Sequence, residues 1–290
     1  MTGSPSPHAT TGLIAVTGAT GHVGGLVAHD LAREGARLRL VVRSAARAPQ
    51  LHGSEVAVAT YGDLDQSVDA LDGVDVLLMV SAAESVDRLA QHRTFIDAAA
   101  RTGVRHVVYT SFLGAAPDAT FTLARDHWAT EEHLRAVGIP HTILRDSFYL
   151  DFLPDLAGPD GVIRGPAGDG LVGGVARADV ARVAAGILLA PDAHAGATYE
   201  LTGREALSLA EAAQIITEVT GRPTTYVPET IEEAYASRAS YGAPDWQVDA
   251  WVSTYTAIAA GELALVTDTV ERLTGRRPMT LRELLAPLAL

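Results

Sequence analysis

The stretch "IAVTGATGHVGG", residues 14–25, places three glycines at regular spacing where an apolar run ends. Gly18, Gly21 and Gly24 form the pattern Gly-x-x-Gly-x-x-Gly between an expected strand and an expected helix. Glycine lets the backbone turn sharply and approach a pyrophosphate, which then binds the free N–H groups at the helix N-terminus. In this context the pattern predicts a dinucleotide site. The other residues expected to line the turn are Thr20, His22 and Val23.

The segments around this turn alternate between short β-branched runs and longer alanine-rich runs. The expected strands cover residues 13–18, 37–43, 55–63, 75–81, 106–111 and 141–147, and the expected helices 22–35, 67–73, 85–103 and 123–138. The strands are almost continuously apolar, as in parallel sheets buried on both faces. Alternating strands and helices with right-handed crossovers predict a Rossmann-type doubly wound parallel sheet over residues 12–150. Residues 1–11 are expected to form a disordered tail.

The pattern changes after about residue 150. Residues 151–174 are rich in glycine, proline and aspartate, with one short strand expected at 162–164. Further strands are expected at 198–203 and 224–229, and helices at 176–191 and 208–223, the second opened by a capping box of Ser208 and Glu211. Residues 230–290 read as helical, with breaks at 242–245 and 274–278. We therefore expect residues 151–290 to form a smaller mixed α/β region that partly extends the same sheet.

Composition excludes several classes of function. The 290 residues include no cysteine and no lysine, which excludes thiolate nucleophiles, iron–sulfur clusters, Schiff bases and a P-loop lysine. The net charge of −13 argues against nucleic-acid binding. The longest apolar runs are of strand length and the first residues lack the features of a secretion signal, so we expect a cytoplasmic protein without a membrane span. The scattered histidines predict no metal site.

The end of the second expected strand decides between NADH and NADPH. An acidic residue there would bind the ribose hydroxyls, whereas an arginine would suit a 2′-phosphate. This chain has Arg43, with Ser44 beside it and Arg47 one helical turn later. Arginine donates paired, charge-assisted hydrogen bonds to phosphate. The sequence therefore favours NADPH, with weaker binding of NADH.

Other cofactor contacts follow from the rule that ligands bind beyond the carboxyl ends of the strands. Asp63 and Leu64 are expected at the adenine. Val80, Ser81 and Ala82 are expected beneath the nicotinamide ribose. Thr110 and Ser111 end the fifth expected strand and are also expected at the cofactor.

Several of these motifs together resemble one family. "VTGATGHVG", "VVYTSFLGA", "LARDHWATEEHLRAVGIPHTILRDSFY" and "ARADVARVAAGILL" are similar to the NmrA-like branch of the atypical short-chain dehydrogenases, over roughly residues 12–285. The nearest type is the flavin-independent NAD(P)H:quinone oxidoreductase. The resemblance implies NADPH binding, hydride transfer to a quinone-like acceptor without flavin or metal, and a C-terminal acceptor pocket. The branch also contains non-catalytic regulators that sense NADP(H) and bind a protein partner, which is the alternative reading.

The proton donor is the open question for a redox enzyme of this type. Where related reductases carry a tyrosine and, four residues later, a lysine, this chain has Leu123 and His127. His127 is expected either as an inert residue bonded to a ribose hydroxyl or as a ribose anchor and proton donor. Glu131, one helical turn later, could orient or charge it. A quinone acceptor lessens the need for a proton donor in the protein, because hydride transfer leaves a stabilised hydroquinone anion that water can protonate.

The acceptor side is expected to follow the sixth strand. Phe148, Tyr149 and Phe152 are predicted to line the acceptor pocket, with Tyr149 also as a catalytic candidate. Ser147 and Phe148 are predicted to contact the nicotinamide side, although Asp146-Ser147 stands where the resemblance implies an asparagine. A dye, an enone or an azo compound is the rival acceptor. The chain is expected to be a monomer or homodimer. The helix that contains Trp246, Trp251, Tyr255 and Ile258 is expected to pack in the core or against another subunit. The alternative is that it forms a lid over the acceptor pocket.

Overall fold

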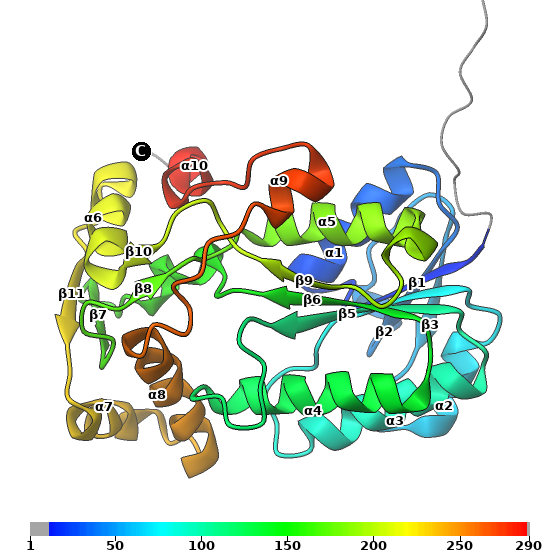
Figure 1. Ribbon diagram of the computed structural model, residues 1–290, viewed down its shortest axis with the longest axis horizontal. Helices are drawn as coiled ribbons and strands as arrows, with labels where there is room; N and C mark the ends of the chain where they lie inside the picture. The colour runs from blue at the N-terminus through cyan, green and yellow to red at the C-terminus, as the bar shows by residue number, and fades with distance from the viewer. Residues whose placement is uncertain (1–11, 289–290) are drawn as a thin grey trace, which may run out of the picture.

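A seven-stranded parallel sheet organises the computed structural model, which describes residues 12–288 (Figure 1). Its strand order is β3-β2-β1-β4-β5-β6-β9. The strands are β1 (Ile14–Thr17), β2 (Leu38–Val42), β3 (Ser54–Val58), β4 (Val76–Met79), β5 (His106–Phe112), β6 (His141–Asp146) and β9 (Thr198–Leu201). The order reverses direction between β1 and β4, so the predicted Rossmann-type doubly wound sheet is confirmed. The tail expected over residues 1–11 lies outside the described residues.

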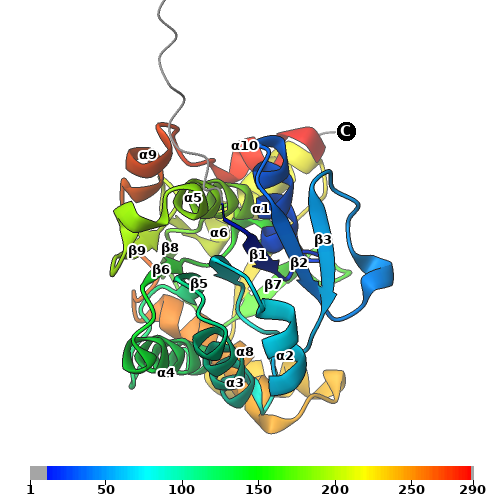
Figure 2. The same cartoon turned by 90° about the vertical axis from the view of Figure 1, so that its right-hand side faces the viewer.

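Helices cover both faces of the sheet (Figures 1 and 2). One face carries α1 (His22–Arg33), α5 (Arg177–Leu189) and α9 (Thr269–Thr274), and the other carries α2 (Leu64–Leu71), α3 (Arg88–Arg101) and α4 (Thr122–Val137). Each face has its own hydrophobic core, and alternate residues of a strand enter different cores. Ile14 and Val16 of β1 pack beneath α1, whereas Ala15 packs on the opposite face. Burial on both faces explains why these strands are almost entirely apolar.

The C-terminal region extends beyond the carboxyl ends of the strands (Figure 1). It contains β7 (Val162–Gly165) paired in parallel with β11 (Thr225–Pro228), and β8 (Leu171–Val172) paired antiparallel with β10 (Leu207–Ser208). Its helices are α6 (Leu209–Thr220), α7 (Ile231–Arg238), α8 (Asp245–Ala259) and α10 (Leu281–Leu285). All of these elements except α7 contribute to a third hydrophobic core, and the capping box at Ser208 and Glu211 is present. The strand β9 returns to the main sheet beside β6.

The helix α8 packs into this third core. Tyr255 and Ile258 are buried there, and Trp251 contacts Tyr241 edge-to-face with ring centroids 5.9 Å apart. The sequence did not predict the β8–β10 pair, because a strand of two residues is too short to show an alternating pattern. The helical C-terminal segment also has a break at residues 260–268, between α8 and α9, which the sequence did not predict.

Candidate functional site

The glycine turn between β1 and α1 has the geometry that its pattern predicts. Gly18 adopts φ +63°, a left-handed conformation that favours glycine. A Cβ on Gly24 would lie 2.5 Å from the carbonyl oxygens of both Thr17 and Gly18, so only glycine allows α1 to start this close to the strand. No side chain caps α1 at Gly21. The exposed turn therefore leaves backbone N–H groups available to an anion.

The other residues of the turn differ in exposure. Thr20 and His22 are exposed, whereas the Val23 side chain is buried in the core beneath α1. Val23 can therefore take part in ligand binding only through its backbone.

The loop that follows β4 contains Val80, Ser81 and Ala82, the residues predicted at the nicotinamide ribose. Hydrogen bonds fix the backbone of all three. The Val80 amide donates to Thr17 Oγ1 (2.9 Å), and the Tyr61 hydroxyl lies 2.7 Å from the Val80 carbonyl oxygen. The Ser81 amide donates to Thr110 Oγ1 (2.9 Å). Thr110 is buried, so its hydroxyl positions this loop from within the sheet.

Two side chains of α3 hold the third residue, Ala82. The Ala82 amide lies 2.8 Å from His92 Nε2, and Arg88 Nε donates to the Ala82 carbonyl oxygen (2.9 Å). Sequence reasoning missed Arg88, His92 and Tyr61. The available signal was the four-residue spacing of Arg88 and His92, which places two polar side chains on one face of a helix expected to pack on the sheet.

His127 is enclosed by protein groups at both ring nitrogens. Its Nε2 lies 2.8 Å from Arg88 Nη2 and its Nδ1 lies 2.9 Å from the Tyr109 hydroxyl. A guanidinium only donates, so Nε2 is the acceptor and the single proton of the neutral ring is on Nδ1, facing Tyr109. Burial, with the nearby Arg88 charge, holds the pKa of His127 well below its usual value.

Both ring nitrogens of His127 are thus engaged by protein groups, Nδ1 by Tyr109 and Nε2 by Arg88. The predicted roles of His127 as ribose anchor and proton donor stay predictions. Glu131 does not contact His127. Instead it forms a paired ion bridge with Arg145 and accepts from Ser111 Oγ at 2.6 Å. Ser111 is therefore committed to this buried cluster.

The carboxyl end of β6 carries a second group of buried polar atoms. The Tyr149 hydroxyl donates to Asp146 Oδ2 (2.7 Å). Burial raises the pKa of Asp146 to about 8, although the Tyr149 hydrogen bond opposes the rise. Asp146 Oδ1 and Ser147 Oγ are fully buried without a hydrogen-bond partner among the described residues. Buried polar atoms of this kind usually bind water or a ligand.

The three predicted acceptor residues lie together. The Phe152 ring centroid lies 6.1 Å from that of Phe148 and 6.0 Å from that of Tyr149. Phe148 packs toward the C-terminal core, whereas Tyr149 packs toward the core beneath α1 and α5. Phe152 remains exposed. The three rings thus stand where the main sheet meets the C-terminal region.

The residues predicted near the 2′-phosphate lie together beside Thr20 of the glycine turn. Thr20, Arg43, Ser44 and Arg47 line a single hollow, and all four are exposed. Asp63 accepts from the Gln66 amide and so caps α2, while Leu64 packs partly against the core on that face. The hollow brings together the residues expected near a 2′-phosphate.

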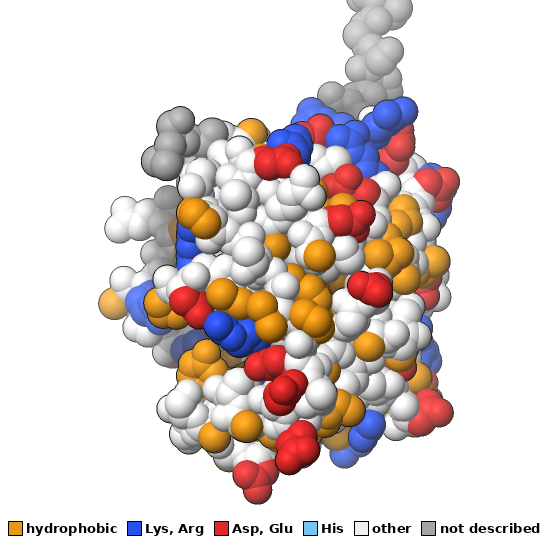
Figure 3. Space-filling model, turned by 90° about the vertical axis from the view of Figure 1, so that its left-hand side faces the viewer, with side chains coloured by type: hydrophobic (Ala, Val, Ile, Leu, Met, Phe, Trp, Pro, Cys, Tyr) orange, Lys and Arg blue, Asp and Glu red, His pale blue; other side chains and the backbone are white. Residues whose placement is uncertain are grey.

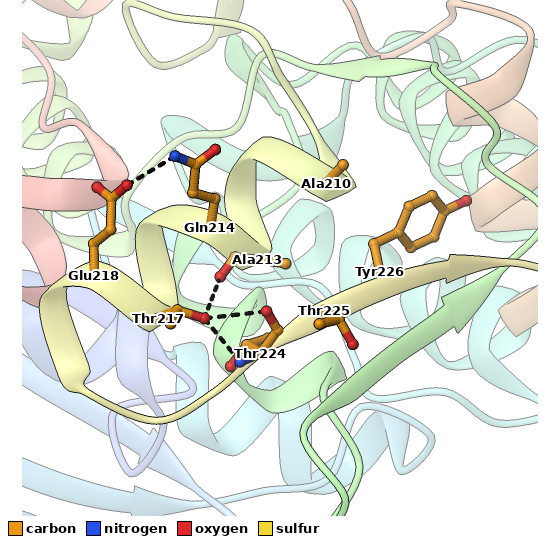
Figure 4. Close-up of a pocket in the computed structure, with 8 residues that line it drawn as sticks. All are labelled: Ala210, Ala213, Gln214, Thr217, Glu218, Thr224, Thr225 and Tyr226. Carbon is orange, nitrogen blue, oxygen red and sulfur yellow. Dashed lines mark hydrogen bonds between the residues drawn. The ribbon is translucent and has the colours of Figure 1, made fainter.

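A second hollow lies in the C-terminal region, between α6 and β11 (Figure 4). It is lined by Ala210, Ala213, Gln214, Thr217, Glu218, Thr224, Thr225 and Tyr226. The Thr217 hydroxyl joins its two sides, because the Thr224 amide donates to it at 2.8 Å. This hydrogen bond fastens β11 to α6. Glu218 is the one charged side chain of the lining, and it pairs with Arg282.

Residues 12–288 contain neither a metal-binding cluster nor a membrane-spanning helix. No group of three or more histidine, aspartate or glutamate side chains there could hold a metal ion. Within the same range, no helix has the length and apolar character needed to cross a membrane.

Comparison with known proteins gives consistent matches over nearly the whole chain. Residues 10–242 match the NmrA-like family. Quinone oxidoreductase 2 of Escherichia coli is 35% identical over 278 residues, which cover 93% of this chain and 96% of that protein. An NAD(P)H azoreductase of Xenophilus azovorans is 32% identical over 277 residues, with the same two coverages. The crystal structure of an NADPH-dependent quinone oxidoreductase from E. coli complexed with NADPH superposes with a TM-score of 0.86 at 35% identity, covering 95% and 99%.

Proposed function

The chain belongs to the NmrA-like family, and we propose that this NAD(P)H-dependent reductase uses NADPH to reduce a quinone or similarly activated acceptor directly, without a flavin. The relatives named for quinone and azo substrates support an acceptor of this class. When bound, the nicotinamide supplies the hydride. The chain's own residues bind the dinucleotide, orient the acceptor and govern the proton.

The residues at the carboxyl edge fit a dinucleotide. The turn at Gly18 and Gly24 presents uncapped N–H groups where a pyrophosphate would bind. Arg43 and Arg47, beside Thr20, form a cationic hollow suited to a 2′-phosphate. Ser81 and Ala82 form a loop whose backbone is already fixed, which limits the entropy lost on binding.

One observation carries the choice of acceptor: His127 is buried and neutral, and its only proton faces Tyr109. Reductases of simple ketones hold an acid near the carbonyl oxygen, because an alkoxide is a poor product without one. A quinone accepts hydride to give a stabilised hydroquinone anion, which then takes up one proton from water or from a weakly acidic neighbour. The structure of this site therefore supports an easily reduced acceptor.

Tyr149 and Asp146 are the proton-bearing pair nearest the proposed acceptor. The Asp146 carboxyl holds a proton below about pH 8, so it can donate to the Tyr149 oxygen while the tyrosine proton turns toward the reduced acceptor. Phe148 and Phe152 would orient the acceptor by stacking on its ring. The pair assists protonation, and hydride transfer does not depend on it.

A regulator that only senses NADP(H) remains the second candidate, and one observation favours it. Val227, Ile231, Tyr235 and Tyr241 are exposed side chains of β11, α7 and the turn after it. Figure 3 shows the face of the C-terminal region, where hydrophobic side chains gather in several places among acidic and basic ones. A protein partner could bind such a face.

Absorbance at the reduced-nicotinamide band separates the two candidates. Purified protein, free of flavin, is mixed with NADPH or NADH and a panel of simple quinones. We expect rapid oxidation of NADPH and slower oxidation of NADH. Tight NADPH binding without oxidation by any quinone, dye or azo acceptor would refute the reductase and support the sensor.

A further inference from the structure

The side chain of Arg177 is a buried cation without an acidic partner. Arg177 is the first residue of α5 and only 9% of its surface is exposed. Its Cζ lies 3.9 Å from the Phe152 ring centroid and 5.3 Å from that of Tyr149. Among residues 12–288 its guanidinium forms neither an ion pair nor a hydrogen bond, although its backbone amide donates to Asp151 Oδ2 (2.9 Å). None of its guanidinium nitrogens is among the fully buried polar atoms without a partner, so these donors reach the solvent while the rest of the side chain is covered.

The nearby carboxyl groups are engaged elsewhere. Asp146 accepts from the Tyr149 hydroxyl, and Asp151 accepts from the first amide of α5. Asp179, also in the first turn of α5, pairs with Arg182 and accepts from the Met279 amide. None of them lies within ion-pair distance of the Arg177 guanidinium, so its donors remain available.

Arg238 provides an internal comparison. It is 8% exposed and lies over the Tyr255 ring at 5.0 Å, so its burial and stacking match those of Arg177. However, Arg238 pairs with Glu229 at 3.0 Å and donates to the carbonyl oxygens of Ala234 and Arg164. Arg238 is therefore a buried, stacked arginine whose guanidinium has acceptors within the protein. Arg177 is buried and stacked in the same way but has no such acceptors in the part of the chain that the structure describes.

We propose that Arg177 binds an anionic group, either a carboxylate, a sulfonate or a phosphate ester, on the acceptor that the enzyme reduces. This inference rests on the proposed function, because it names the class of acceptor for the same site. The guanidinium touches Phe152 and Tyr149, two of the three proposed acceptor residues. A guanidinium presents paired donors that match the oxygens of such groups.

The position of Arg177 favours the acceptor over the cofactor phosphates. Tyr149, its neighbour, follows β6, which is three strands away from β1 in the sheet order. At a spacing of about 4.8 Å, three strands separate them by roughly 14 Å. The pyrophosphate site at the end of β1 has its own N–H groups. In a protein of net charge −13, a local cation is also needed to attract an anionic acceptor.

The test compares two quinones that differ in charge, 1,4-naphthoquinone-2-sulfonate and 2-methyl-1,4-naphthoquinone. In Arg177→Gln we expect kcat/KM for the sulfonated quinone to fall by about 10- to 100-fold, the range for a charge-assisted contact. The neutral quinone and the Kd of NADPH should change by less than about threefold. Arg238→Gln is the matched control, and should affect both quinones equally.

Binding of 2-naphthalenesulfonate, which cannot be reduced, provides a readout independent of turnover. Titration calorimetry with NADP⁺ present should show wild type binding it more tightly than neutral 2-naphthalenemethanol, and Arg177→Gln should lose this preference. Arg177→Lys, which keeps the charge, should retain part of it, and it serves if the glutamine variant does not fold. Unchanged selectivity would overturn the proposal, as would weaker NADPH binding with equal loss for both quinones. If wild type reduced no quinone, the proposed function would fail while the calorimetry still decided the anion site.

Discussion

Arg88 Nη2 lies 2.8 Å from His127 Nε2, although the two residues are 39 positions apart and belong to different helices. The sequence predicts that His127 stands where related reductases carry a lysine, and Arg88 brings a permanent positive charge next to it. Arg88 Nη1 also lies 3.5 Å from Asp126 Oδ2. A chain without lysine thus keeps a cation beneath the loop at Ala82, and His127 links that cation to Tyr109.

Replacing His127 by alanine should affect stability more than chemistry. The substitution leaves an Arg88 N–H and the Tyr109 hydroxyl buried without partners, at about 1–3 kcal/mol each. We expect the free energy of unfolding in urea to fall by about 2–4 kcal/mol. His133→Ala, a partly exposed site on the same helix, should cost less than 1 kcal/mol by comparison.

The kinetic counterpart is the pH dependence of kcat for a quinone. Because His127 holds no proton that can reach the acceptor, His127→Ala should keep the shape of the wild-type profile between about pH 6 and 8. Loss of an acid-dependent limb in this variant would instead support the predicted role of His127 as a proton donor.

The sheet and the glycine turn could be predicted because their signals are local. A strand such as β4, buried at all four residues, is continuously apolar, and Gly18 and Gly24 are required by backbone geometry within one turn. The contacts around His127 could not be predicted in the same way. They join His127 to residues 18 and 39 positions away, and the sequence pattern alone gives no indication that Arg88 rather than Glu131 reaches the ring.

Asp146 should make the protein less stable as pH rises. Its pKa is raised to about 8 in the fold by burial, whereas in the unfolded chain it ionises near 3.8. Its contribution is therefore full below about pH 4 and is lost as pH rises toward 8, at up to ~1.4 kcal/mol per pH unit. Asp146→Asn has no such group, so its free energy of unfolding relative to wild type should increase from pH 5 to pH 8. Asp69→Asn, at an exposed position, should leave the pH dependence unchanged.

His92 should act in the opposite direction. Burial, with the Arg88 charge, lowers its pKa to about 3, so the neutral ring is favoured in the fold. The unfolded chain takes up a proton below about pH 6.5, and stability should fall from that pH downward by up to ~1.4 kcal/mol per unit. Chemical denaturation of His92→Gln should give a lower free energy of unfolding at pH 7 but a shallower decline toward pH 4.5. An equal slope in the two proteins would show that His92 is protonated in the fold.

Gly24→Ala should disrupt the dinucleotide turn, because its Cβ would lie 2.5 Å from two backbone oxygens. Backbone cannot move aside as a flexible side chain can, so α1 would shift away from β1. We expect a loss of more than about tenfold in NADPH affinity, together with lower stability. Gly25→Ala is the matched variant, since its Cβ would lie 3.2 Å from a single oxygen. Fluorescence titration with NADPH distinguishes the two, and similar affinities would mean that the turn tolerates displacement.

Arg43 should determine the preference between the two dinucleotides. If it binds the 2′-phosphate, Arg43→Ala removes a contact of about 1.5–3 kcal/mol that only NADPH can form. The Kd of NADPH should rise by about 10- to 100-fold while that of NADH stays within about threefold. Arg37→Ala, an exposed arginine just before β2, controls for the change in net charge and should alter neither Kd by more than a small factor. Raising the salt concentration should narrow the gap between wild type and Arg43→Ala, because the contact lies at an exposed site. Equal weakening of both dinucleotides in Arg43→Ala would mean that Arg43 supports the adenosine as a whole, and that the phosphate is bound elsewhere.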